Sequence, residues 1–583
     1  MYFKNQIYIL FQKILSACNR FPISVLFSVL ATLAFILANR LSFPTLEQHQ
    51  LFIRLGMTFG LGVPISLSAQ ALCEKVQIKT NKVKTVIFSL LFLLLLSFLI
   101  FMLKEITMVT VTRYAALFLA FTLAFTFIPF FFKAPKFELY VIRLFTSFFI
   151  TYLYSMILFM GVSALLLTIN LLFSINISSK AYLDIWLIVV GVFAPAFFLA
   201  DIPKNHQYLT VNDYPKVISV LLRYILTPLI AAYTLILYIY FGNILLAREL
   251  PQGVVANLVL WYLMLSTAVL LAISPLKKTS KWTSMFKSYL PKLSLPLLVM
   301  MLVSLYIRIS AYGFTERRYF ALVAGLWLVG IMLYHIFSSR KRGIVIPISL
   351  AVIAILSVIG PWSAYSTSIS SQNTRFERLL TEHDMLKNGE IQPQKELSVE
   401  DRYELSSIII YFNSNHDLSK LSYLPDGFSL LRDTKDVFGF ELQRSRHDHF
   451  RQRREYFRIH LSEDELIDIN QYQHFGHFTL NIHASSELKL GDFLVTANDK
   501  KSELYIYKNE DVIYSKDIGS IAKEIYNQHE GTEVLSLTKM TYSDKNQNTD
   551  IKLVFKNIYG FKDEENNSIK VESMEFYIFF SFR

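Results

Sequence analysis

The sequence contains few cysteines, and none in its C-terminal part. Both cysteines, Cys18 and Cys73, lie near the beginning of the 583-residue chain. Residues 361–583 therefore have no disulfide framework and no thiolate metal site. Their stability has to come from an ordinary hydrophobic core, and a segment of roughly 220 residues is long enough to bury one.

Acidic residues are scarce in the first part of the chain. Residues 1–360 contain 30 Lys and Arg but only 9 Asp and Glu, whereas residues 361–583 contain 27 and 36. The formal net charge of +12 is thus the sum of a region with +21 and a region with −9. Because the positive charges of the first region stand in short loops between apolar runs, they are not a nucleic-acid signal, and we expect no nucleic acid as a partner.

Known catalytic motifs are also missing. The chain has no Ser-His-Asp signature, no P-loop, no GxGxxG and no zinc-protease motif. Histidines in the second region suggest a metal site, but no pattern of Asp, Glu or Cys accompanies them, so we expect no metal and no cofactor. These histidines are His447, His449, His474, His477 and His483.

Long apolar runs dominate residues 1–360. Over the whole chain 53% of residues are hydrophobic and 17% are charged, whereas about 25% are charged in soluble domains. A helix needs about 20 mainly apolar residues to cross the hydrocarbon core of a bilayer. The sequence predicts about eleven such transmembrane helices, at residues 22–39, 51–71, 85–103, 114–132, 144–173, 182–200, 217–246, 254–274, 293–309, 319–338 and 344–360.

Two of these predicted helices, 144–173 and 217–246, are longer than a bilayer requires. Each is one helix that tilts or projects from the membrane, or else two shorter helices. If the N-terminus is cytoplasmic and each is single, the inside segments contain 21 Lys and Arg and the outside loops nine. This asymmetry follows the positive-inside rule. We therefore expect a cytoplasmic N-terminus and an extracytoplasmic C-terminal domain, with the lipid bilayer as a partner.

The charge change divides the chain into three predicted regions. They are a polytopic transmembrane domain of α-helices (1–360), a connector (361–397) and a soluble extracytoplasmic α+β domain (398–583) with an antiparallel sheet. In the last region, Ser398 to Asp401 resembles a capping box, and alternating apolar residues predict strands. The predicted elements are a helix from 398 to about 413, a hairpin at 503–517, a helix at 518–529, and strands at 551–556 and 575–582.

A run of charged residues lies between the ninth and tenth predicted membrane helices, on a side where positive charge is otherwise sparse. Gly313 permits a tight turn there, and Thr315 can cap the next helix with Glu316 in its first turn. The favoured interpretation is a capped turn with a local ion pair. The alternative is a site for an anion or a lipid headgroup, because guanidinium groups suit phosphate and carboxylate. The candidate ligand-binding residues are Arg308, Tyr312, Glu316, Arg317 and Arg318.

Arg54 is a further ligand-binding candidate, because charged residues at membrane depth are costly and often functional. It lies near the start of the second predicted membrane helix. Gly56, Gly60 and Pro64 follow it and predict a small-residue face and a kink. The simpler interpretation is that Arg54 extends its charged group to the membrane surface.

A predicted hinge follows the last membrane helix. Gly360 and Pro361 should end that helix. A Ser-rich stretch comes next and contains Gln372 and Arg375. We expect it to connect the membrane part to a short amphipathic helix that precedes the soluble domain.

These motifs resemble the bacterial inner-membrane family called domain of unknown function 4153. The resemblance rests on YGFTERRYF at 312–320, with Arg308 before it, and on GPWSAYSTSISSQNTRFERLL at 360–380. Segments 21–37 and 551–560 fit as well. The resemblance covers most of the chain and implies a protein of the bacterial cytoplasmic (inner) membrane. It implies no activity and no catalytic residues.

Three functions are compatible with this sequence. A non-enzymatic envelope sensor, scaffold or assembly factor, whose outer domain binds an envelope protein or polymer, is favoured because catalytic motifs are missing. A transporter or lipid flippase would usually place several charged groups near the membrane midplane, and the sequence has no such cluster and no internal repeat. A membrane glycosyltransferase needs carboxylates in an outer loop, but residues 40–50 offer only Glu47.

Overall fold

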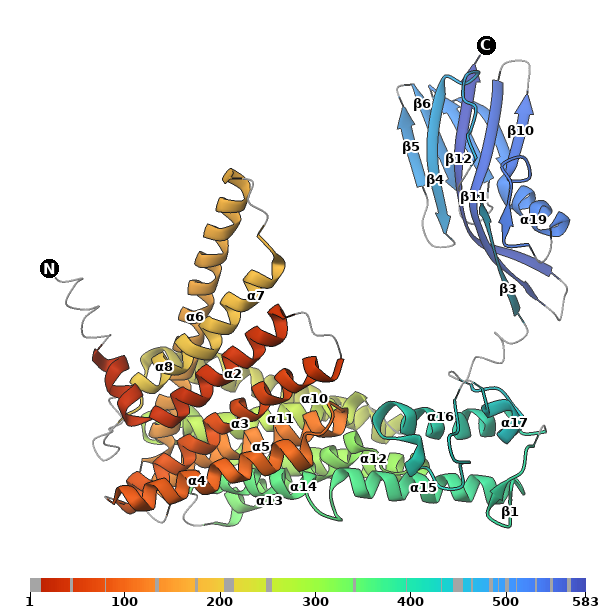
Figure 1. The fold of residues 1–583 in the computed structure, drawn as a ribbon. Helices are drawn as coiled ribbons and strands as arrows, with labels where there is room; N and C mark the ends of the chain where they lie inside the picture. Colours follow the sequence, from red (N-terminus) through yellow and green to blue (C-terminus); the bar gives the residue numbers. More distant parts are fainter. Residues whose placement is uncertain are drawn as a thin grey trace. The chain divides into compact units, whose positions relative to one another are not determined.

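The chain divides into two compact units. The first comprises Met1–Pro393 and Ile408–Phe438, and the second comprises Gln394–Ser407 and Gly439–Arg583. The structure is a computed structural model (Figure 1). It describes residues 12–41, 46–78, 80–131, 136–173, 177–203, 214–247, 254–338, 342–394, 396–430, 432–443, 454–462, 465–481, 486–490, 492–498, 503–509, 511–529, 532–545, 549–563 and 568–582.

The first unit is a helical bundle. Its described residues contain ten helical segments that are long and apolar enough to cross a membrane, which confirms the predicted all-helical membrane architecture. An eleventh apolar helix, α14 (Val345–Val358), has 14 residues and is shorter than a bilayer requires. The ten are α2 (Pro22–Arg40), α3 (Leu46–Val76), α4 (Asn81–Ser97) with η1 (Phe98–Met102), α5 (Met108–Phe127) with η2 (Ile128–Phe130), α6 (Phe137–Phe173), α7 (Ser179–Ile188) with η3 (Val189–Phe193) and α8 (Ala194–Ala200), α9 (Lys216–Val220) with η6 (Leu221–Leu226) and α10 (Thr227–Ala247), α11 (Val254–Ile273), α12 (Lys281–Tyr312) and α13 (Glu316–Phe337).

Each of the two long apolar segments forms one undivided helical segment. Helix α6 continues without a break for 37 residues. The segment formed by α9, η6 and α10 also continues as one candidate span, with a π-helical stretch inside it. Of the two possibilities that the sequence left open, the structure has the undivided helices.

Helices α2 and α3 approach each other closely through glycines of α3. A Cβ atom at Gly56 would lie 2.7 Å from the ring of Phe35, and one at Gly62 would lie 2.8 Å from the ring of Phe27. These glycines therefore let the phenylalanine rings of α2 pack against the backbone of α3. This close contact is the role that the sequence predicted for the small residues after Arg54.

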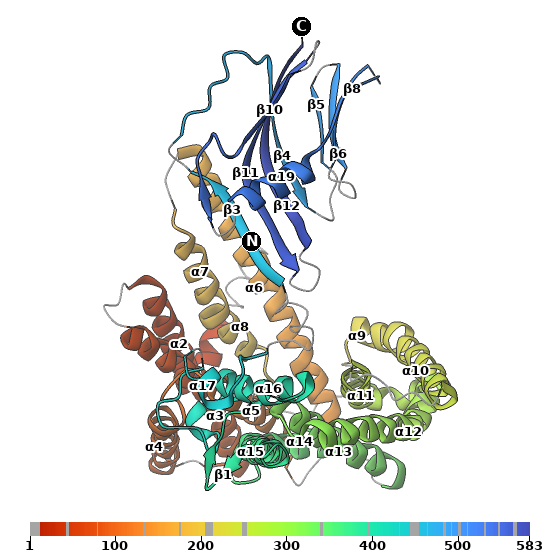
Figure 2. The ribbon, with the colours of Figure 1, turned by 90° about the vertical axis from the view of Figure 1, so that its right-hand side faces the viewer.

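Helix α15 (Ala364–Glu382) follows a turn at Gly360, which has a φ of +93°. Ser363 caps α15, because its hydroxyl accepts a hydrogen bond from the backbone N–H of Ser366. The helix packs beside α13 and α14 (Figure 2). The Ser-rich stretch that we expected to precede a short helix thus lies within a helix of 19 residues. The spacing of its buried residues explains this difference, because they recur every three or four positions and form one face: Tyr365, Ser368, Gln372, Arg375, Phe376 and Leu379.

Short elements complete the first unit. They include a small hairpin of β1 (Leu386–Lys387) and β2 (Glu390–Ile391), and the helices η8 (Leu418–Lys420) and α17 (Thr434–Phe438). Helix α16 (Val399–Asn415) contributes its residues from 408 onward to this unit. Its first residues belong to the second unit, where the backbone N–H of Asp401 donates to the Ser398 hydroxyl over 3.1 Å, which is the first of the two hydrogen bonds of the predicted capping box.

The second unit contains two β-sheets. The larger has the order β4-β12-β11-β3-β9, with β10 paired to β11, and the smaller has the order β5-β6-β7-β8. Of the pairings among described residues, only the short one between β3 and β9 is parallel. The strands are β3 (Arg454–Leu461), β4 (His474–Asn481), β5 (Ser486–Leu490), β6 (Phe493–Asn498), β7 (Glu503–Lys508), β8 (Asp511–Asp517), β9 (Val534–Leu535), β10 (Thr541–Lys545), β11 (Thr549–Asp563) and β12 (Ser568–Phe582).

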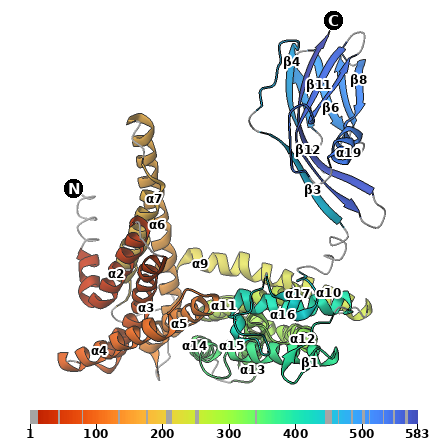
Figure 3. The same ribbon diagram turned by 45° about the vertical axis from the view of Figure 1, so that its right-hand side comes forward.

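The core of this unit is formed by both sheets together with α19 (Ile518–Gln528), which lies against β12 and β7 (Figure 3). It includes Phe478 and Phe576 from the larger sheet, Ile506 from the smaller sheet, and Ile521 and Ile525 from α19. The predicted α+β architecture with a mainly antiparallel sheet is therefore confirmed. The predicted hairpin at 503–517 is the pair of strands β7 and β8, and the predicted helix at 518–529 is α19.

Candidate functional site

The turn between α12 and α13 requires a glycine. Helix α12 ends at Tyr312, and Gly313 bends the chain with φ +68° and ψ 178°, a conformation that only glycine adopts readily. A Cβ atom at Gly313 would also lie 2.9 Å from Nε2 of Gln372 and 3.0 Å from Oγ of Ser371. The absence of a side chain therefore allows both the bend and the close approach of α15.

Helix α15 holds this turn through its polar side chains. Nε2 of Gln372 donates to the carbonyl oxygens of Tyr312 over 2.9 Å and of Phe314 over 2.7 Å. The backbone N–H of Phe314 donates to Oγ of Ser371 over 2.9 Å. Gln372 is only 2% exposed, so these bonds satisfy polar groups that water cannot reach. Hydrogen bonds thus hold together two motifs that lie about 60 residues apart in the sequence.

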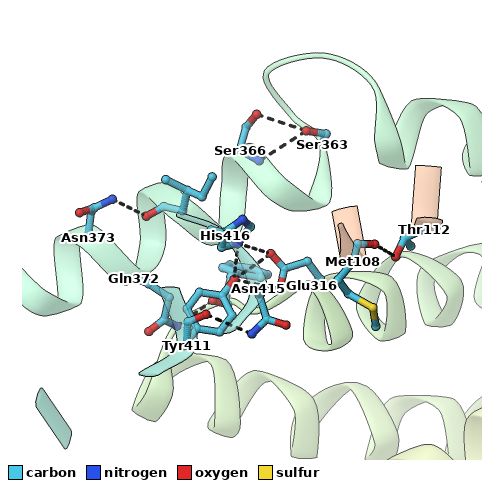
Figure 4. A network of polar contacts seen from close by, with 12 residues as sticks. Met108, Thr112, Glu316, Ser363, Ser366, Gln372, Asn373, Tyr411, Asn415 and His416 are labelled. Carbon is cyan, nitrogen blue, oxygen red and sulfur yellow. Dashed lines mark hydrogen bonds and ion pairs between the residues drawn. The ribbon is translucent and has the colours of Figure 1, made fainter. Parts of the chain in front are cut away.

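The predicted side-chain cap of α13 is wrong. Thr315 occupies the N-cap position, but its side chain makes no capping hydrogen bond. The predicted local ion pair of Glu316 with an arginine of the turn is not formed either. The Glu316 carboxylate instead accepts hydrogen bonds from the Tyr411 hydroxyl, over 2.8 Å to each oxygen, and from Nε2 of His416 over 2.8 Å (Figure 4).

We call Glu316, Tyr411 and His416 the carboxylate network. The hydroxyl of Tyr411 also lies 3.0 Å from Nε2 of His416, so each member contacts the other two. The side chain of His416 is 1% exposed and that of Glu316 is 19% exposed. Burial and the negative charge of Glu316 raise the pKa of Tyr411. The tyrosine therefore keeps its proton and donates a hydrogen bond to the carboxylate.

The sequence did not indicate Tyr411 or His416 as members of the site. They lie about 100 residues after Glu316, at the end of a helix that the sequence assigned to another domain. A tyrosine and a histidine five positions apart are common in any helix. No pattern in the sequence therefore indicated that they would bind a membrane-helix carboxylate.

Two arginines lie against the ring of Tyr312. The guanidinium carbon of Arg318 is 5.6 Å from the ring centroid and that of Arg375 is 5.7 Å from it. Nη1 of Arg318 donates to the carbonyl oxygens of Tyr312 over 3.0 Å and of Gly313 over 2.7 Å. Arg308 is exposed and lies four residues before the end of α12, and its charge and that of Arg375 both act on Arg318. Arg317 is exposed. We call Arg308, Arg318 and Arg375 the arginine group.

Helix α5 also takes part in this region. The guanidinium carbon of Arg113 lies 4.9 Å from the ring centroid of Tyr365. Burial raises the pKa of Tyr365 to about 12, and the charges of Arg113 and Glu316 act on its hydroxyl in opposite directions. Figure 4 shows Met108 and Thr112 of α5 close to Glu316. The sequence did not single out Arg113.

Arg54 has a different partner from the other candidates. Its Nη2 atom donates to the carbonyl oxygen of Leu99 in η1 over 3.5 Å, a long hydrogen bond. Its Nε atom is buried and has no hydrogen-bond partner among the described residues. The contacts of Arg54 therefore include neither the turn at Gly313 nor the carboxylate network.

The second unit presents an aromatic surface on the side of β4 and β12 that faces away from its core. We call Tyr472, Phe475, His477, Tyr577 and Phe579 the aromatic sheet face. Phe475 is 57% exposed, Tyr577 and Tyr472 (just before β4) are half-buried, and Phe579 is buried. The ring centroid of Phe475 lies 5.1 Å from that of Phe579 and 5.7 Å from that of Tyr577. The ring of His477 lies 5.1 Å from that of Tyr577.

A charged cluster borders this face at Glu575. Its carboxylate accepts hydrogen bonds from Nζ of Lys556 over 2.8 Å, from Nδ2 of Asn557 over 2.6 Å and from Nε2 of His477 over 2.9 Å. The hydrogen bond from Lys556 is the main reason that the pKa of Glu575 falls to about 2. Apolar and ionic contacts are thus available side by side on one sheet face.

The described residues contain no group of three or more His, Cys, Asp or Glu side chains that could hold a metal ion. His474 packs between aromatic rings, with centroid distances of 4.9 Å to Phe580 and 5.1 Å to Phe493. His477 binds Glu575, as described above. The other histidines considered for a metal site, His447, His449 and His483, lie outside the described residues.

Ten long apolar helices joined to a mainly antiparallel β unit indicate a polytopic membrane protein with an appended β domain. Residues 24–386 match the family described as Domain of unknown function (DUF4153), and the chain belongs to this family. The match includes the turn at Gly313 and helix α15, whereas the similar segment at 551–560 lies beyond it.

A curated relative of the chain is Uncharacterized protein PM1469 from Pasteurella multocida (strain Pm70). The two chains are 29% identical over 220 residues, which is 38% of each chain. The similarity therefore extends over well under half of the relative. No solved structure matches this chain.

Proposed function

We propose that this protein is a non-enzymatic component of the bacterial inner membrane. In this proposal it acts as a sensor, scaffold or assembly factor, and its C-terminal domain (398–583) binds an envelope protein or polymer outside the cytoplasm. The orientation is supported by the excess of Lys and Arg in the segments assigned to the cytoplasm.

The observation that carries this proposal is the aromatic sheet face. Two neighbouring rings of this face are open to solvent, since Phe475 is 57% exposed and the side chain of His477 is 44% exposed. Neighbouring exposed rings bordered by polar groups are typical of a binding surface. Aromatic residues provide a large contact area with few rotatable bonds, and they are enriched in the centres of interfaces. The neighbouring Glu575 cluster adds polar groups that can fix the orientation of a partner.

A crosslinking experiment with the full chain tests this proposal. A photoreactive phenylalanine analogue replaces Phe475 on β4 or, as the matched control, Val512 on β8, which is 54% exposed. Both positions are exposed apolar residues of the same unit, but they belong to different sheets. We expect discrete adducts in cells from position 475 and none from position 512. Adducts from both positions, or from neither, would contradict the assignment of the binding face.

A second experiment tests the orientation. A reporter that is active only outside the cytoplasm, fused after Arg583, should be active in cells. The same reporter inserted near Lys281, in the most basic predicted cytoplasmic loop, should be silent. The reverse pattern would disprove the proposed topology.

A transporter or lipid flippase is the second candidate, because one acidic residue is buried within an apolar span. Asp184 in α7 is 7% exposed, and it binds the guanidinium of Arg40 and the side-chain amide of Asn39, the latter over 2.7 Å. The same span contains the π-helical segment η3, a feature frequent at functional sites. Proton flux into vesicles that contain the protein, abolished in Asp184→Asn, would favour this candidate. Absence of flux in the unchanged protein would remove it.

A further inference from the structure

Three positive charges meet where α12 ends and α13 begins. Arg308 and Tyr312 are four residues apart and therefore share one face of α12. Arg318 extends from the first turn of α13 to the same tyrosine, and Arg375 reaches that tyrosine from α15. The arginine group thus comes from three different helices: Arg318 and Arg375 lie against one aromatic ring, and the charge of Arg308 acts on Arg318. Sequence position alone would not bring Arg375 there.

Nearby carboxylates do not neutralise two of these arginines. Arg308 and Arg318 form no ion pair with any carboxylate in the described part of the chain. Glu316 stands two residues before Arg318, but its oxygens accept hydrogen bonds from Tyr411 and His416. The hydrogen bonds of Arg318 go to backbone carbonyls, which carry no net charge. Like charges held close together favour the binding of an anion.

The position of the arginine group limits the chemistry of that anion. A turn between two membrane helices lies at the membrane surface, which is the level of lipid phosphate groups. Guanidinium groups bind two oxygens of a phosphate at once, and the planar fork is held in place by stacking on an aromatic ring. The N-terminus of α13 adds a partial positive charge at the same place.

We propose that Arg308, Arg318 and Arg375 bind a phosphate group at the α12–α13 turn. The phosphate belongs either to the headgroup of an anionic lipid or to a small soluble phosphate ester, and both sources offer the same oxygens to the arginines. Gly313, Gln372 and Ser371 position the site, because they fix the turn against α15. This site does not depend on what the second unit binds.

Binding is measured on the purified full-length protein in detergent. The unfolding temperature is followed during titration with three probes: short-chain phosphatidylglycerol, glycerol phosphate and sodium phosphate. Sodium chloride at matched ionic strength controls for general screening. A ligand that binds only the folded protein raises the unfolding temperature as its concentration passes its Kd. We expect at least one phosphate probe to stabilise the protein beyond the chloride control.

The variants separate this site from general charge effects. Arg308→Gln removes an exposed arginine of the group, so the protein should still fold. Arg317→Gln is the matched control, because it removes the same charge from a neighbouring exposed position outside the group. We expect the apparent Kd to rise about tenfold or more in Arg308→Gln and less than twofold in Arg317→Gln. Arg308→Lys should lie between the unchanged protein and Arg308→Gln, because lysine keeps the charge but lacks the planar fork.

Each outcome has a defined consequence. Stabilisation by phosphatidylglycerol alone identifies a lipid headgroup site, and stabilisation by glycerol phosphate or sodium phosphate identifies a site for soluble phosphates. Three results would overturn the proposal: no stabilisation by any phosphate probe, equal stabilisation by chloride, or equal losses of affinity in Arg308→Gln and Arg317→Gln.

Discussion

Glu316 in the first unit and Glu575 in the second have similar partners in different surroundings. Each carboxylate accepts hydrogen bonds from a histidine and from at least one further side chain. The histidine that binds Glu316 is 1% exposed, whereas the histidine that binds Glu575 is 44% exposed. The two carboxylates are similarly exposed, at 19% and 22%, so the difference lies in the partners. Water can reach His477 and Lys556 if Glu575 is lost, but it hardly reaches His416 if Glu316 is lost. The same chemistry should therefore contribute more to stability in the first unit than in the second.

The largest expected effect is that of Glu316→Ala. This change leaves the donors of Tyr411 and His416 without their acceptor in a place that water hardly reaches, at a cost of about 3–5 kcal/mol in the free energy of unfolding. Glu575→Ala should cost about 1 kcal/mol, because its partners are open to water. Unfolding of both variants of the full chain in detergent measures the difference. Equal losses in the free energy of unfolding would show that burial does not make the hydrogen bonds of Glu316 more stabilising than those of Glu575.

The next effect concerns Gly313, which holds the turn before Glu316. Gly313→Ala should cost about 1–3 kcal/mol, because its combination of φ and ψ is strained for any residue with a Cβ atom. Gly330→Ala in α13 is the matched control, since a Cβ atom there meets nothing within 4 Å. It should leave stability unchanged or raise it by about 0.5–1 kcal/mol. Gly313→Ala should therefore lower the unfolding temperature, whereas Gly330→Ala should not. An unfolding temperature that Gly313→Ala leaves unchanged would contradict the described turn.

Acid should weaken the Glu575 cluster of the second unit. The pKa of Glu575 is lowered from 4.5 to about 2 in the folded protein. Its contribution to stability is therefore complete above a pH of about 4.5 and is lost as the pH falls towards 2. Hydrogen exchange of β12 in the full chain, measured between pH 6 and pH 2.5, should show this loss of protection. In Glu575→Gln, β12 should lose less protection over the same pH range. If the pH dependence of protection is the same in this variant, Glu575 is not the group that causes the loss.

The smallest expected effect is that of Thr315→Ala. Because the Thr315 side chain caps nothing, its loss should change the free energy of unfolding by less than about 0.5 kcal/mol. Thr107 is the matched comparison, because its hydroxyl accepts a hydrogen bond from the backbone N–H of Thr110 in a capping box of α5. Thr107→Ala should cost about 0.5–2 kcal/mol. A cost of that size for Thr315→Ala would show that the cap at α13 forms after all.

Much of the fold could be predicted because its signals are local. A run of about 20 apolar residues can satisfy its backbone in a membrane only as a helix, so the helices of the first unit follow from composition. The alternation of apolar and polar residues in β11 and the capping box at Ser398 are local in the same way. The ends of the helices and strands were harder to predict than their existence. Half of the buried residues of α15 carry polar groups, among them Ser368, Gln372 and Arg375, and hydrophobic periodicity therefore did not reveal the full length of this helix.

The candidate site could be predicted only in part. The sequence pointed to Arg308, Glu316 and Arg318, because a cluster of charges near membrane helices is unusual. It did not pair Glu316 with His416, because that contact joins residues 100 positions apart and has no periodic signature. The predicted side-chain cap at Thr315 was wrong for a related reason. Propensity describes which residue suits a position, whereas the packing around α13 determines what its side chain binds.

The amino-acid sequence alone determined that the first 360 residues form apolar helices, that the last part folds as a mainly antiparallel α+β unit, and that arginines gather at one turn. These properties depend on composition and on neighbours within a few positions. Only the tertiary structure placed Gln372 on the turn at Gly313 and enclosed Glu316 between Tyr411 and His416. The physical reason is that a buried polar group has to find a partner within hydrogen-bond distance in space, and separation along the chain says little about which group that will be.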